Sequence, residues 1–341
     1  MSHLWNPYVY KDLKLRNRIV MAPMCQYSVS TKDGIPNDWH YTHYTSRAVG
    51  GVGLVTIEMT DVHPDGRITD YCLGIWSDEH IAPFARIIDA CHRHGAKVSM
   101  QIAHAGRKAE HAQLPVAPSA IRYDAPQYKT PHEMSTDEVK RMVENFAAGA
   151  RRAVKAGVDA VELHGAHGYL IHQFQSPLTN KRTDAYGDDL SRFGAEVATA
   201  VKAELPSGMP LIMRISAVEY VEGGYGIHHA IEIARRYHDA GVDMFHVSSG
   251  GEGTPAPGRG PGNFPAYQVP FARAMKEALH VPIIAVGRLD DAEVADSVLG
   301  NGDADLVAIG RGLLRDPYWA IHAGLSQGDK PELPTQYGRA F

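Results

Sequence analysis

The sequence is poor in cysteine and lacks long apolar runs. Its 341 residues include 3 cysteines, at positions 25, 72 and 91, and none of these form a C-x-x-C pair. This excludes clustered-cysteine zinc and iron–sulfur motifs, and an odd number of cysteines fits a reducing compartment better than a disulfide framework. No apolar run approaches the length of a membrane span, and the first residues lack the basic and apolar segments of a signal peptide. We therefore expect a cytoplasmic protein that does not cross a membrane.

Charge of one sign is not concentrated anywhere along the chain. The formal net charge is -5, from 34 basic and 39 acidic residues that are scattered through the sequence. Nucleic-acid binding needs a basic stripe and binding to an anionic membrane needs a polybasic patch, and the sequence shows neither. With 44% hydrophobic and 21% charged residues, the composition is that of a globular protein with a sizeable core. We expect small-molecule partners, and neither nucleic acid nor membrane.

Eight short runs of apolar and β-branched residues recur along the chain, each followed by Gly, Pro or polar residues and then by a helical pattern. Runs that are apolar on both faces are typical of parallel strands covered by helices, because each crossover needs a helix to return the chain. Eight such repeats predict an α/β fold, a single (β/α)8 TIM barrel over residues 1–341. The predicted strands are Arg18–Met24, Gly53–Thr60, Ala96–Ala103, Val158–His164, Pro210–Ser216, Val242–Ser249, Val281–Val286 and Ala304–Ile309.

Amphipathic segments between these runs predict the covering helices. The residues from Ser135 to Glu138 form a capping box before a helix over Val139–Ala156, and Gly157 supplies the left-handed residue that ends it. Further helices are predicted over Ile81–His94, Ser191–Leu205, His229–Ala240, Val269–Leu279 and Ala292–Leu299.

A doubly wound sheet is the competing architecture. Its phosphate fingerprint, a G-x-G-x-x-G turn after the first strand, is missing, because the first run ends in Ala22-Pro23-Met24-Cys25. Two segments rich in Pro, Gly or polar residues, 106–133 and 250–263, are predicted to be loop insertions carried by the barrel.

The ends of the predicted strands are rich in chemical groups. Active sites of TIM barrels lie at the carboxyl ends of the strands, so these positions are the candidates for function. The groups that follow the runs in chain order are Cys25 and Tyr27; Glu58 and Met59; Gln101 and His104; His164, His167 and Tyr169; Arg214; Gly287 and Arg288; and Gly310 and Arg311.

The last two runs predict a phosphate site. They end in Gly287-Arg288 and Gly310-Arg311, where a glycine lets backbone amides approach an anion and an arginine adds positive charge. Phosphate sites after the seventh and eighth strands recur in TIM barrels. The alternative interpretation is that the two glycines only permit tight turns.

His164 and His167 admit two functional interpretations. Paired histidines can ligate a metal, although a catalytic metal needs a third ligand, and the direction of nearby Glu162 does not follow from the sequence. Alternatively, both imidazoles bind one substrate oxygen, with Tyr169 beside them as a proton source. Arg214 lies within an apolar run, and a buried guanidinium requires an anionic or strongly polar partner.

The chain resembles the Old Yellow Enzyme family of FMN-dependent ene-reductases, and specifically its short, thermophilic-like subclass. The cysteine after Pro23-Met24, with Tyr27 two residues later, indicates the subclass. The segments that carry the resemblance lie in order along nearly the whole chain: residues 16–20 (RNRIV), 22–27 (APMCQY), 66–69 (GRIT), 101–108 (QIAHAGRK), 164–170 (HGAHGYL), 180–184 (NKRTD) and 309–311 (IGR).

This resemblance implies a non-covalent FMN across the mouth of the barrel. Arg214 would lie beside the pyrimidine part of the flavin and stabilise the anion that forms on reduction, and Cys25 would tune the flavin potential. Gly287, Gly310 and Arg311 would bind the phosphate, with Arg288 adding charge beside it. The edge of the flavin ring would contact Ala22, Pro23, Met24, Met59 and Gln101.

The resemblance also implies the reaction. NADPH would reduce the flavin, and the same pocket would then accept an activated alkene: an α,β-unsaturated carbonyl compound, a maleimide or a nitroalkene. His164 and His167 would hold its carbonyl oxygen, Tyr169 would protonate its α-carbon, and Tyr27 would line the pocket. Arg339, in the C-terminal tail 330–341, would reach the site of a neighbouring subunit in a homodimer or homotetramer.

Three other functions remain open from the sequence. The first is a related flavin barrel, although the chain lacks the clustered cysteines and the appended dinucleotide domain of those enzymes. The second is a metal-dependent barrel lyase or hydrolase that uses His164 and His167, and the third is a non-catalytic flavin-binding protein. Tyr169 beside both histidines favours an enzyme over the third.

Overall fold

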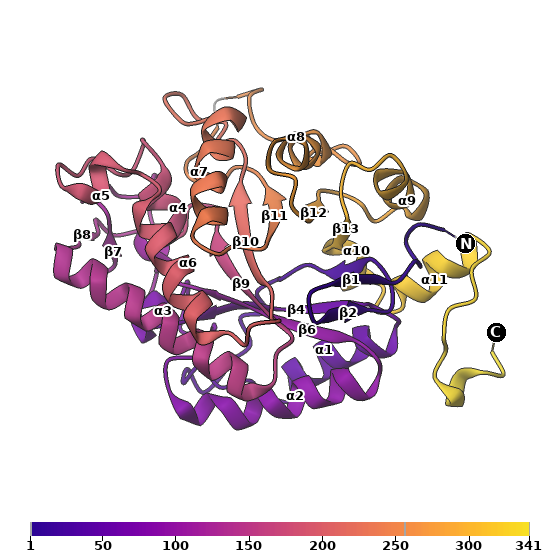
Figure 1. Cartoon of the computed structure of the whole chain (residues 1–341). Helices are drawn as coiled ribbons and strands as arrows, with labels where there is room; N and C mark the ends of the chain where they lie inside the picture. The colour runs from indigo at the N-terminus through magenta and orange to yellow at the C-terminus, as the bar shows by residue number, and fades with distance from the viewer. Residues whose placement is uncertain (1, 256, 341) are drawn as a thin grey trace.

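The computed structural model describes residues 2–255 and 257–340, and at its centre eight parallel strands close into a barrel (Figure 1). The eight strands predicted from the sequence are all present. The first is shorter than predicted and ends before Pro23, which has no N–H to donate to a neighbouring strand. In order around the barrel the strands are β3 (Ile19–Met21), β4 (Leu54–Asp61), β6 (Lys97–Ala103), β9 (Ala160–Gly165), β10 (Leu211–Ser216), β11 (Met244–Ser248), β12 (Ile283–Val286) and β13 (Leu306–Ile309).

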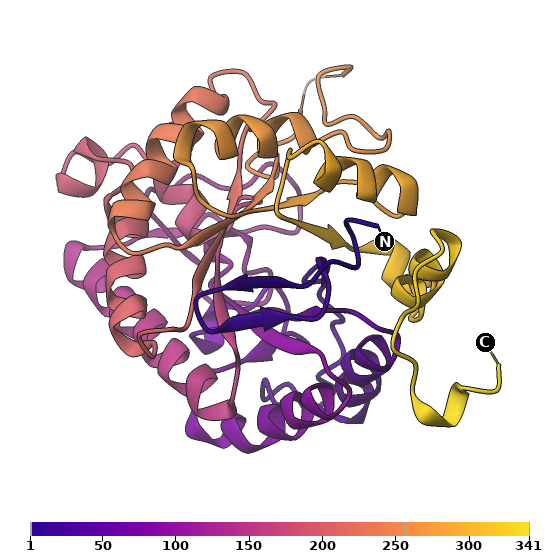
Figure 2. The ribbon, with the colours of Figure 1, turned by 45° about the vertical axis from the view of Figure 1, so that its right-hand side comes forward.

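The interior of the barrel is apolar at the amino ends of the strands. An N-terminal hairpin, β1 (Tyr8–Tyr10) and β2 (Leu13–Leu15), lies across this end of the barrel and packs Leu13 and Leu15 against the interior side chains (Figure 2). The amino end of the barrel is therefore closed, and polar interior groups are left to the opposite end. The interior apolar residues that the hairpin joins are Val20, Ala22, Leu54, Ala160, Ile212, Met244, Ile284, Leu306 and Ala308.

Three aspartates tie neighbouring strands together at the amino end. Asp159, Asp243 and Asp305 precede β9, β11 and β13, and each carboxylate accepts the backbone N–H of a residue at the start of the adjacent strand at 2.8–2.9 Å. Each also pairs with a lysine. Because a carboxylate that accepts an N–H and pairs with a cation is well satisfied, these positions fix the strand ends.

Helices cover the outside of the barrel. The capping box of Ser135 and Glu138 is present, and Gly157 ends the helix with φ +99°. The helix after β3 was not predicted; it follows an extended loop that carries Tyr27. The larger helices are α1 (Asp38–Val49), α2 (Ile81–Arg93), α3 (Thr136–Ala156), α6 (Arg192–Glu204), α7 (Ile227–Asp239), α8 (Val269–Leu279), α9 (Ala292–Gly300) and α11 (Trp319–Ser326).

The remaining elements are short and lie in the connections. In the predicted insertion 106–133 they are η3 (Gly106–Lys108), β7 (Val116–Ala117) and β8 (His132–Glu133). No described helix or strand falls within residues 250–263. The others are β5 (Leu73–Gly74), η1 (Pro64–Gly66), η2 (Asp78–His80), α4 (Leu170–Gln175), α5 (Ala185–Asp188), α10 (Arg311–Arg315) and η4 (Thr335–Tyr337).

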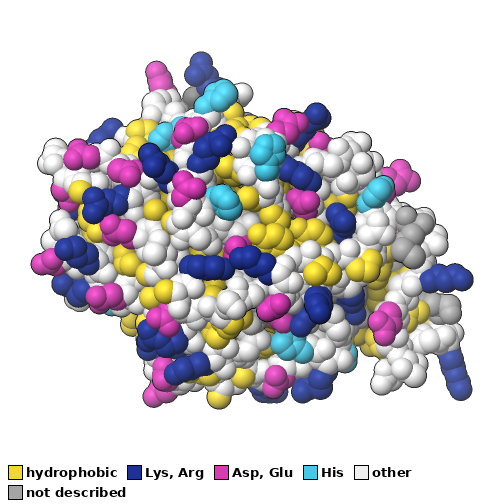
Figure 3. Space-filling model, in the orientation of Figure 1, with side chains coloured by type: hydrophobic (Ala, Val, Ile, Leu, Met, Phe, Trp, Pro, Cys, Tyr) yellow, Lys and Arg dark blue, Asp and Glu magenta, His cyan; other side chains and the backbone are white. Residues whose placement is uncertain are grey.

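The surface carries both signs of charge. On the face shown in Figure 3, Lys and Arg side chains alternate with Asp and Glu, without a broad area of one sign. None of the described helices combines the length and the apolar character that crossing a bilayer requires.

Candidate functional site

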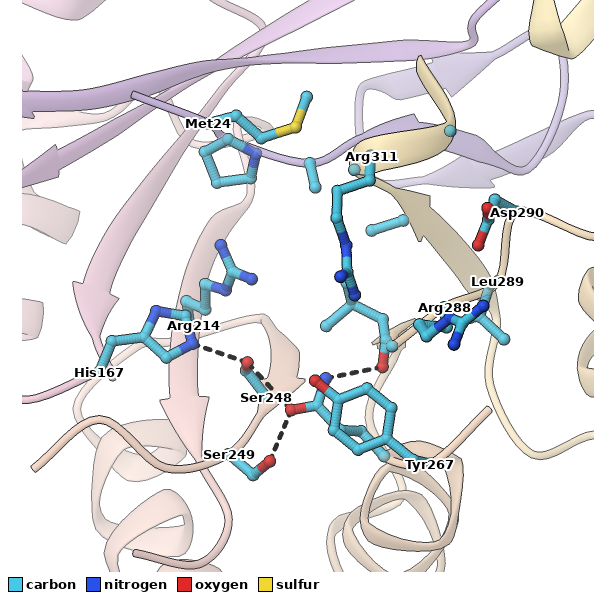
Figure 4. Close-up of a pocket in the computed structure, with 18 residues that line it drawn as sticks. Met24, His167, Arg214, Ser248, Ser249, Tyr267, Arg288, Leu289, Asp290 and Arg311 are labelled. Carbon is cyan, nitrogen blue, oxygen red and sulfur yellow. Dashed lines mark hydrogen bonds between the residues drawn. The ribbon is translucent and has the colours of Figure 1, made fainter. Parts of the chain in front are cut away.

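A cavity of about 260 Å³ opens at the carboxyl ends of the strands (Figure 4). Its walls come from the segments that follow β3, β9, β12 and β13, from the ends of β10 and β11, and from the start of α8. It contains nine of the residues predicted for the site: Ala22, Pro23, Met24, His167, Arg214, Gly287, Arg288, Gly310 and Arg311.

The other predicted residues adjoin this cavity or lie apart from it. Cys25, Met59 and Tyr169 belong to one apolar cluster, and Tyr169 contacts the ring of His164, which is itself beside Arg214. Tyr27 is 47% exposed and follows Cys25 in the loop after β3. Six predicted positions are not among the residues that line the cavity: Cys25, Tyr27, Met59, Gln101, His164 and Tyr169.

Arg214 brings a buried cation to the cavity. It lies on β10 between His164 of β9 and His246 of β11, which are its partners in the strand register. The side chain points into the cavity (Figure 4), and its buried Nε has no hydrogen-bond partner among the described residues. A buried guanidinium without a partner is costly, so this position calls for an anionic or polar ligand in the cavity.

Glu162 does not face the histidine pair as a metal ligand would. Its Oε1 accepts a hydrogen bond from Gln101 Nε2 at 2.6 Å, and its Oε2 lies 3.0 Å from His246 Nδ1. Burial raises the pKa of Glu162, but His246 and Arg214 outweigh burial and hold the pKa below its ordinary value. The carboxylate is committed to these neighbours, so the metal interpretation of His164 and His167 loses its nearest third ligand.

His164, His167 and Tyr169 form one aromatic group. The ring centroids of His164 and His167 are 5.1 Å apart, and those of His164 and Tyr169 are 4.8 Å apart. The Nδ1 atom of His164 accepts the N–H of Ala166 at 3.3 Å, which places the ring proton on Nε2. His167 has φ +59°, and its Nε2 lies 2.7 Å from the Oγ of Ser248. The sequence prediction that these three side chains come together is confirmed.

Burial sets the protonation of this group. It lowers the pKa of both His164 and His167 well below the ordinary value, and the charge of Arg214 lowers them further. Burial also raises the pKa of Tyr169 well above its ordinary value, with Cys25 contributing. At neutral pH both imidazoles are therefore uncharged, and the phenol retains its proton.

The glycine-rich ends of β12 and β13 are open toward the cavity. Gly287 has φ +132°, a conformation that other residues rarely adopt, and a Cβ there would come within 3.0 Å of Gln268 Nε2. A Cβ at Gly310 would lie 3.5 Å from the Sδ of Met24, so the backbone at this position is not crowded. Arg311 extends into the cavity (Figure 4), whereas Arg288 bonds to the carbonyl of Asn263 at the cavity edge. These groups fit a phosphate.

The loop after β3 is held by a buried glutamate. The Oε2 of Glu58 accepts the N–H of Gln26 at 2.6 Å and its Oε1 accepts the hydroxyl of Tyr44 at 2.9 Å. Burial raises the pKa of Glu58 to about 7. Burial also raises the pKa of Cys25 well above its ordinary value, with Glu58 as the next contribution, so the side chain is a neutral thiol rather than an activated nucleophile.

Sequence reasoning missed several residues that line the cavity, among them Ser248, Ser249, Tyr267 and Gln268. Gln268 donates from Nε2 to the carbonyl of Val286 at 3.0 Å, while its Oε1 accepts from the hydroxyls of Ser248 and Ser249 (Figure 4). Ser248 ends β11 and Ser249 follows it, so the same inspection of strand ends that identified the other residues could have found them. Tyr267 and Gln268 precede α8, and nothing in the local sequence indicates that they turn toward the cavity.

A buried group of potential metal ligands lies outside the cavity lining. His172, Glu219 and Glu252 place potential ligand atoms within 4.8 Å of one another. However, Arg107 Nη2 already pairs with Glu252 Oε1 at 2.8 Å, and His172 Nδ1 accepts the N–H of Gly168 at 2.8 Å. With a cation in place and an imidazole nitrogen engaged, this group acts as a buried charge network and is not assigned a metal.

Arg339 lies outside this site within its own chain. It is exposed in the tail, which contacts the barrel through the hydroxyls of Tyr318 and Tyr337 at 3.3 Å. Figures 1 and 2 show the tail leaving the body of the molecule beside α11. A role in a neighbouring subunit stays a prediction.

Comparison with known proteins finds similarity along nearly the whole chain. The sequence profile of the NADH:flavin oxidoreductase / NADH oxidase family matches residues 3–327. An NADPH dehydrogenase of Halalkalibacterium halodurans is 46% identical, with the alignment covering 100% of both chains. The structure of morphinone reductase in complex with tetrahydroNAD superimposes with a TM-score of 0.81, at 28% identity, over 97% of this chain and 92% of that one. A 2-naphthoyl-CoA reductase complex gives a TM-score of 0.88 at 26% identity over 96% of this chain, which spans 52% of that longer chain.

Proposed function

The chain belongs to the NADH:flavin oxidoreductase / NADH oxidase family, an FMN-dependent oxidoreductase family of the Old Yellow Enzyme type, and on this basis we propose that it reduces activated carbon–carbon double bonds with NADPH. The substrates are α,β-unsaturated carbonyl compounds, maleimides or nitroalkenes. The observation that carries the proposal is the juxtaposition of His164, His167 and Tyr169 beside a cavity lined by Arg214, whose buried Nε has no hydrogen-bond partner among the described residues.

The residues around the cavity fit FMN. Arg311 and the backbone at Gly287 and Gly310 would bind the phosphate, with Arg288 beside it, and Arg214 would provide the cation for the pyrimidine part of the ring. Ala22, Pro23, Met24, Met59 and Gln101 would contact the ring. When bound, FMN accepts a hydride from NADPH and supplies it to the alkene. The unpartnered Nε of Arg214 and the uncrowded backbone at Gly310 support this assignment.

His164 and His167 activate the alkene through its carbonyl or nitro oxygen. Both imidazoles are neutral, so they act as hydrogen-bond donors and not as acids. Because His164 Nδ1 is engaged by a backbone N–H, its Nε2–H is the donor. Hydrogen bonds to the oxygen withdraw electrons from the conjugated system and make the β-carbon electrophilic.

Tyr169 supplies the proton. Its phenol stays protonated well above neutral pH, and its ring lies against His164, where the activated oxygen is bound. Transfer of this proton to the α-carbon completes the reduction. Tyr27, exposed at the edge of the loop after β3, lines the substrate side of the pocket, and Cys25 acts on the flavin as a neutral thiol.

An oligomer completes the substrate pocket in this proposal. Arg339 lies in a tail that leaves the barrel, and we assign it to the substrate site of a neighbouring subunit in a homodimer or homotetramer. Arg339→Ala should then raise KM for the alkene without weakening FMN binding, as measured by steady-state kinetics and flavin fluorescence. An unchanged KM would remove Arg339 from the site.

The colour of the protein tests the proposed function. Purified protein should be yellow, anaerobic NADPH should bleach it, and 2-cyclohexenone should restore the colour in proportion to the alkene added. Colourless protein that does not bind added FMN, or bleached protein that no activated alkene reoxidises, would contradict the proposal. Turnover compared across enones, maleimides and nitroalkenes would then define the substrate class.

A further inference from the structure

A buried lysine lies over the ring of the proposed proton donor. Lys108 belongs to η3, the turn that follows β6, and is 9% exposed. Its Nζ lies 5.6 Å from the ring centroid of Tyr169 and 4.3 Å from that of Tyr123. Neither the resemblance nor the geometry of the cavity gives this residue a role.

Backbone carbonyls hold the ammonium in place. Lys108 Nζ donates to the carbonyl of His167 at 2.8 Å and also to the carbonyl of Gly251. Glu252, the carboxylate that interacts with the charge of Lys108, is already paired with Arg107. The charge of Lys108 is therefore positioned by neutral acceptors and is not neutralised by an ion pair of its own.

Proton donation creates a need for such a charge. When Tyr169 gives its proton to the α-carbon, the O–H bond breaks, its electron pair stays on Oη, and a phenolate remains in a buried environment. A cation over an aromatic ring interacts more strongly with a phenolate than with a neutral phenol. The ionisable groups that raise the pKa of Tyr169 are Cys25, Tyr27, Cys72 and Tyr128, and none of them offers a positive charge. Arg214 is a further cation that interacts with the charge of Tyr169.

We propose that Lys108 is a positioning residue that stabilises the Tyr169 phenolate during reduction of the alkene. The inference rests on the proposed function, in which Tyr169 donates the proton. In this step the alkene gains a hydride at the β-carbon and the proton of Tyr169 at the α-carbon. Water then returns a proton to Oη, while Lys108 keeps its own protons and only lowers the cost of the anion.

The ionisation of residue 169 tests the inference without measuring activity. Tyr169 in the FMN-loaded protein would be replaced by 3,5-difluorotyrosine, whose phenol ionises far more readily than that of tyrosine, and followed by ¹⁹F NMR against pH. Lys108→Met should decrease the acid dissociation constant of this phenol about tenfold. Lys108→Arg, which keeps the charge, should leave the constant close to the wild-type value. Lys140→Met, a change at an exposed lysine of α3, is the matched control. Equal constants in the wild-type and Lys108→Met backgrounds would overturn the inference.

A double-mutant cycle separates this inference from the proposed function. Lys108→Met should slow reoxidation by 2-cyclohexenone about tenfold in the wild-type background and have no further effect in the Tyr169→Phe background. A full Lys108→Met effect in both backgrounds would show that the lysine acts only through the carbonyl of His167, and would overturn the inference alone. If Tyr169→Phe by itself leaves reoxidation unchanged, the proton-donor role fails as well.

Discussion

Arg214 on β10 is the register partner of His164 on β9, so a guanidinium and an imidazole lie side by side at the wall of the cavity. The guanidinium remains charged, and together with burial it holds the pKa of His164 well below the ordinary value. The same cation thus serves two purposes. In the proposed function it would meet an anionic ligand in the cavity, and it would keep the neighbouring imidazole a neutral donor for a substrate oxygen.

Removing the donor of His164 should weaken phenol binding. A phenolate oxygen would occupy the place of the substrate oxygen, and hydrogen bonds to a charged acceptor contribute about 1.5–3 kcal/mol. We expect His164→Ala to raise the Kd of phenol by about 10- to 100-fold, as measured from the absorbance change of the bound flavin. His164→Asn, which keeps an N–H donor, should lose much less affinity for phenol. Equal losses in the two variants would argue against a hydrogen-bond role.

Replacing Arg214 should change the flavin. Arg214→Met removes the cation that we propose lies next to the pyrimidine ring, so the reduced, anionic flavin should lose more stabilisation than the oxidised one. We expect the two-electron potential to fall by at least about 30 mV, equivalent to about 1.4 kcal/mol. Anaerobic titration with a reference dye would measure it, with Arg214→Lys as the charge-retaining control. An unchanged potential in Arg214→Met would show that Arg214 does not lie beside the flavin ring.

The charge of Lys108 should appear in the pH dependence of alkene reduction. Burial lowers the pKa of Lys108 to about 8, against the opposing effect of Glu252 and assisted by Arg107. The ammonium is therefore present below pH 8 and lost as the pH rises through it. The groups around it are Arg107, Tyr123, His167, Tyr169 and Glu252.

We expect the rate of reoxidation by 2-cyclohexenone to fall above about pH 8, as measured by stopped-flow absorbance. The decrease should be absent in Lys108→Arg, because a guanidinium stays charged in this range. A fall in rate that persists unchanged in Lys108→Arg would assign the transition to another group.

Gly251 should be needed to place His167. It has φ +99°, and a Cβ there would come within 2.4 Å of the Cα of His167. Gly251→Ala should destabilise the protein by about 3 kcal/mol in chemical denaturation and weaken phenol binding. Gly258→Ala is the matched control, since Gly258 has φ +77° but its Cβ would meet no described atom within 4 Å. Gly258→Ala should lower the free energy of unfolding by about 1 kcal/mol and leave phenol binding intact.

The sequence predicts the barrel and most of the site for a simple reason. Parallel strands end at one rim, so the groups after each apolar run, such as His164, Arg214 and Gly287, must lie near one another whatever the details of the loops. The direction of a side chain is harder to predict. Glu162 could have faced the histidines, and only the packing of Gln101 and His246 inside the barrel turns it away.

Contacts between distant loops could not be predicted from local pattern. Gln268 reaches the cavity from the start of α8. Lys108 reaches Tyr169 from η3, where its Nζ donates to the carbonyls of His167 and Gly251. These contacts depend on tertiary packing, and no periodicity or short motif encodes it. The first helix, over Asp38–Val49, was missed because a long irregular segment separates it from β3.

The two half-reactions of Tyr169→Phe, measured separately by anaerobic stopped-flow absorbance, test the central claim most directly. Loss of a general acid should slow reoxidation by 2-cyclohexenone by about 10²- to 10⁴-fold, while reduction by NADPH stays within about twofold of the wild-type rate. Equal slowing of both half-reactions, or an unchanged rate of reoxidation, would contradict the assignment of Tyr169 as the proton donor beside the histidine pair.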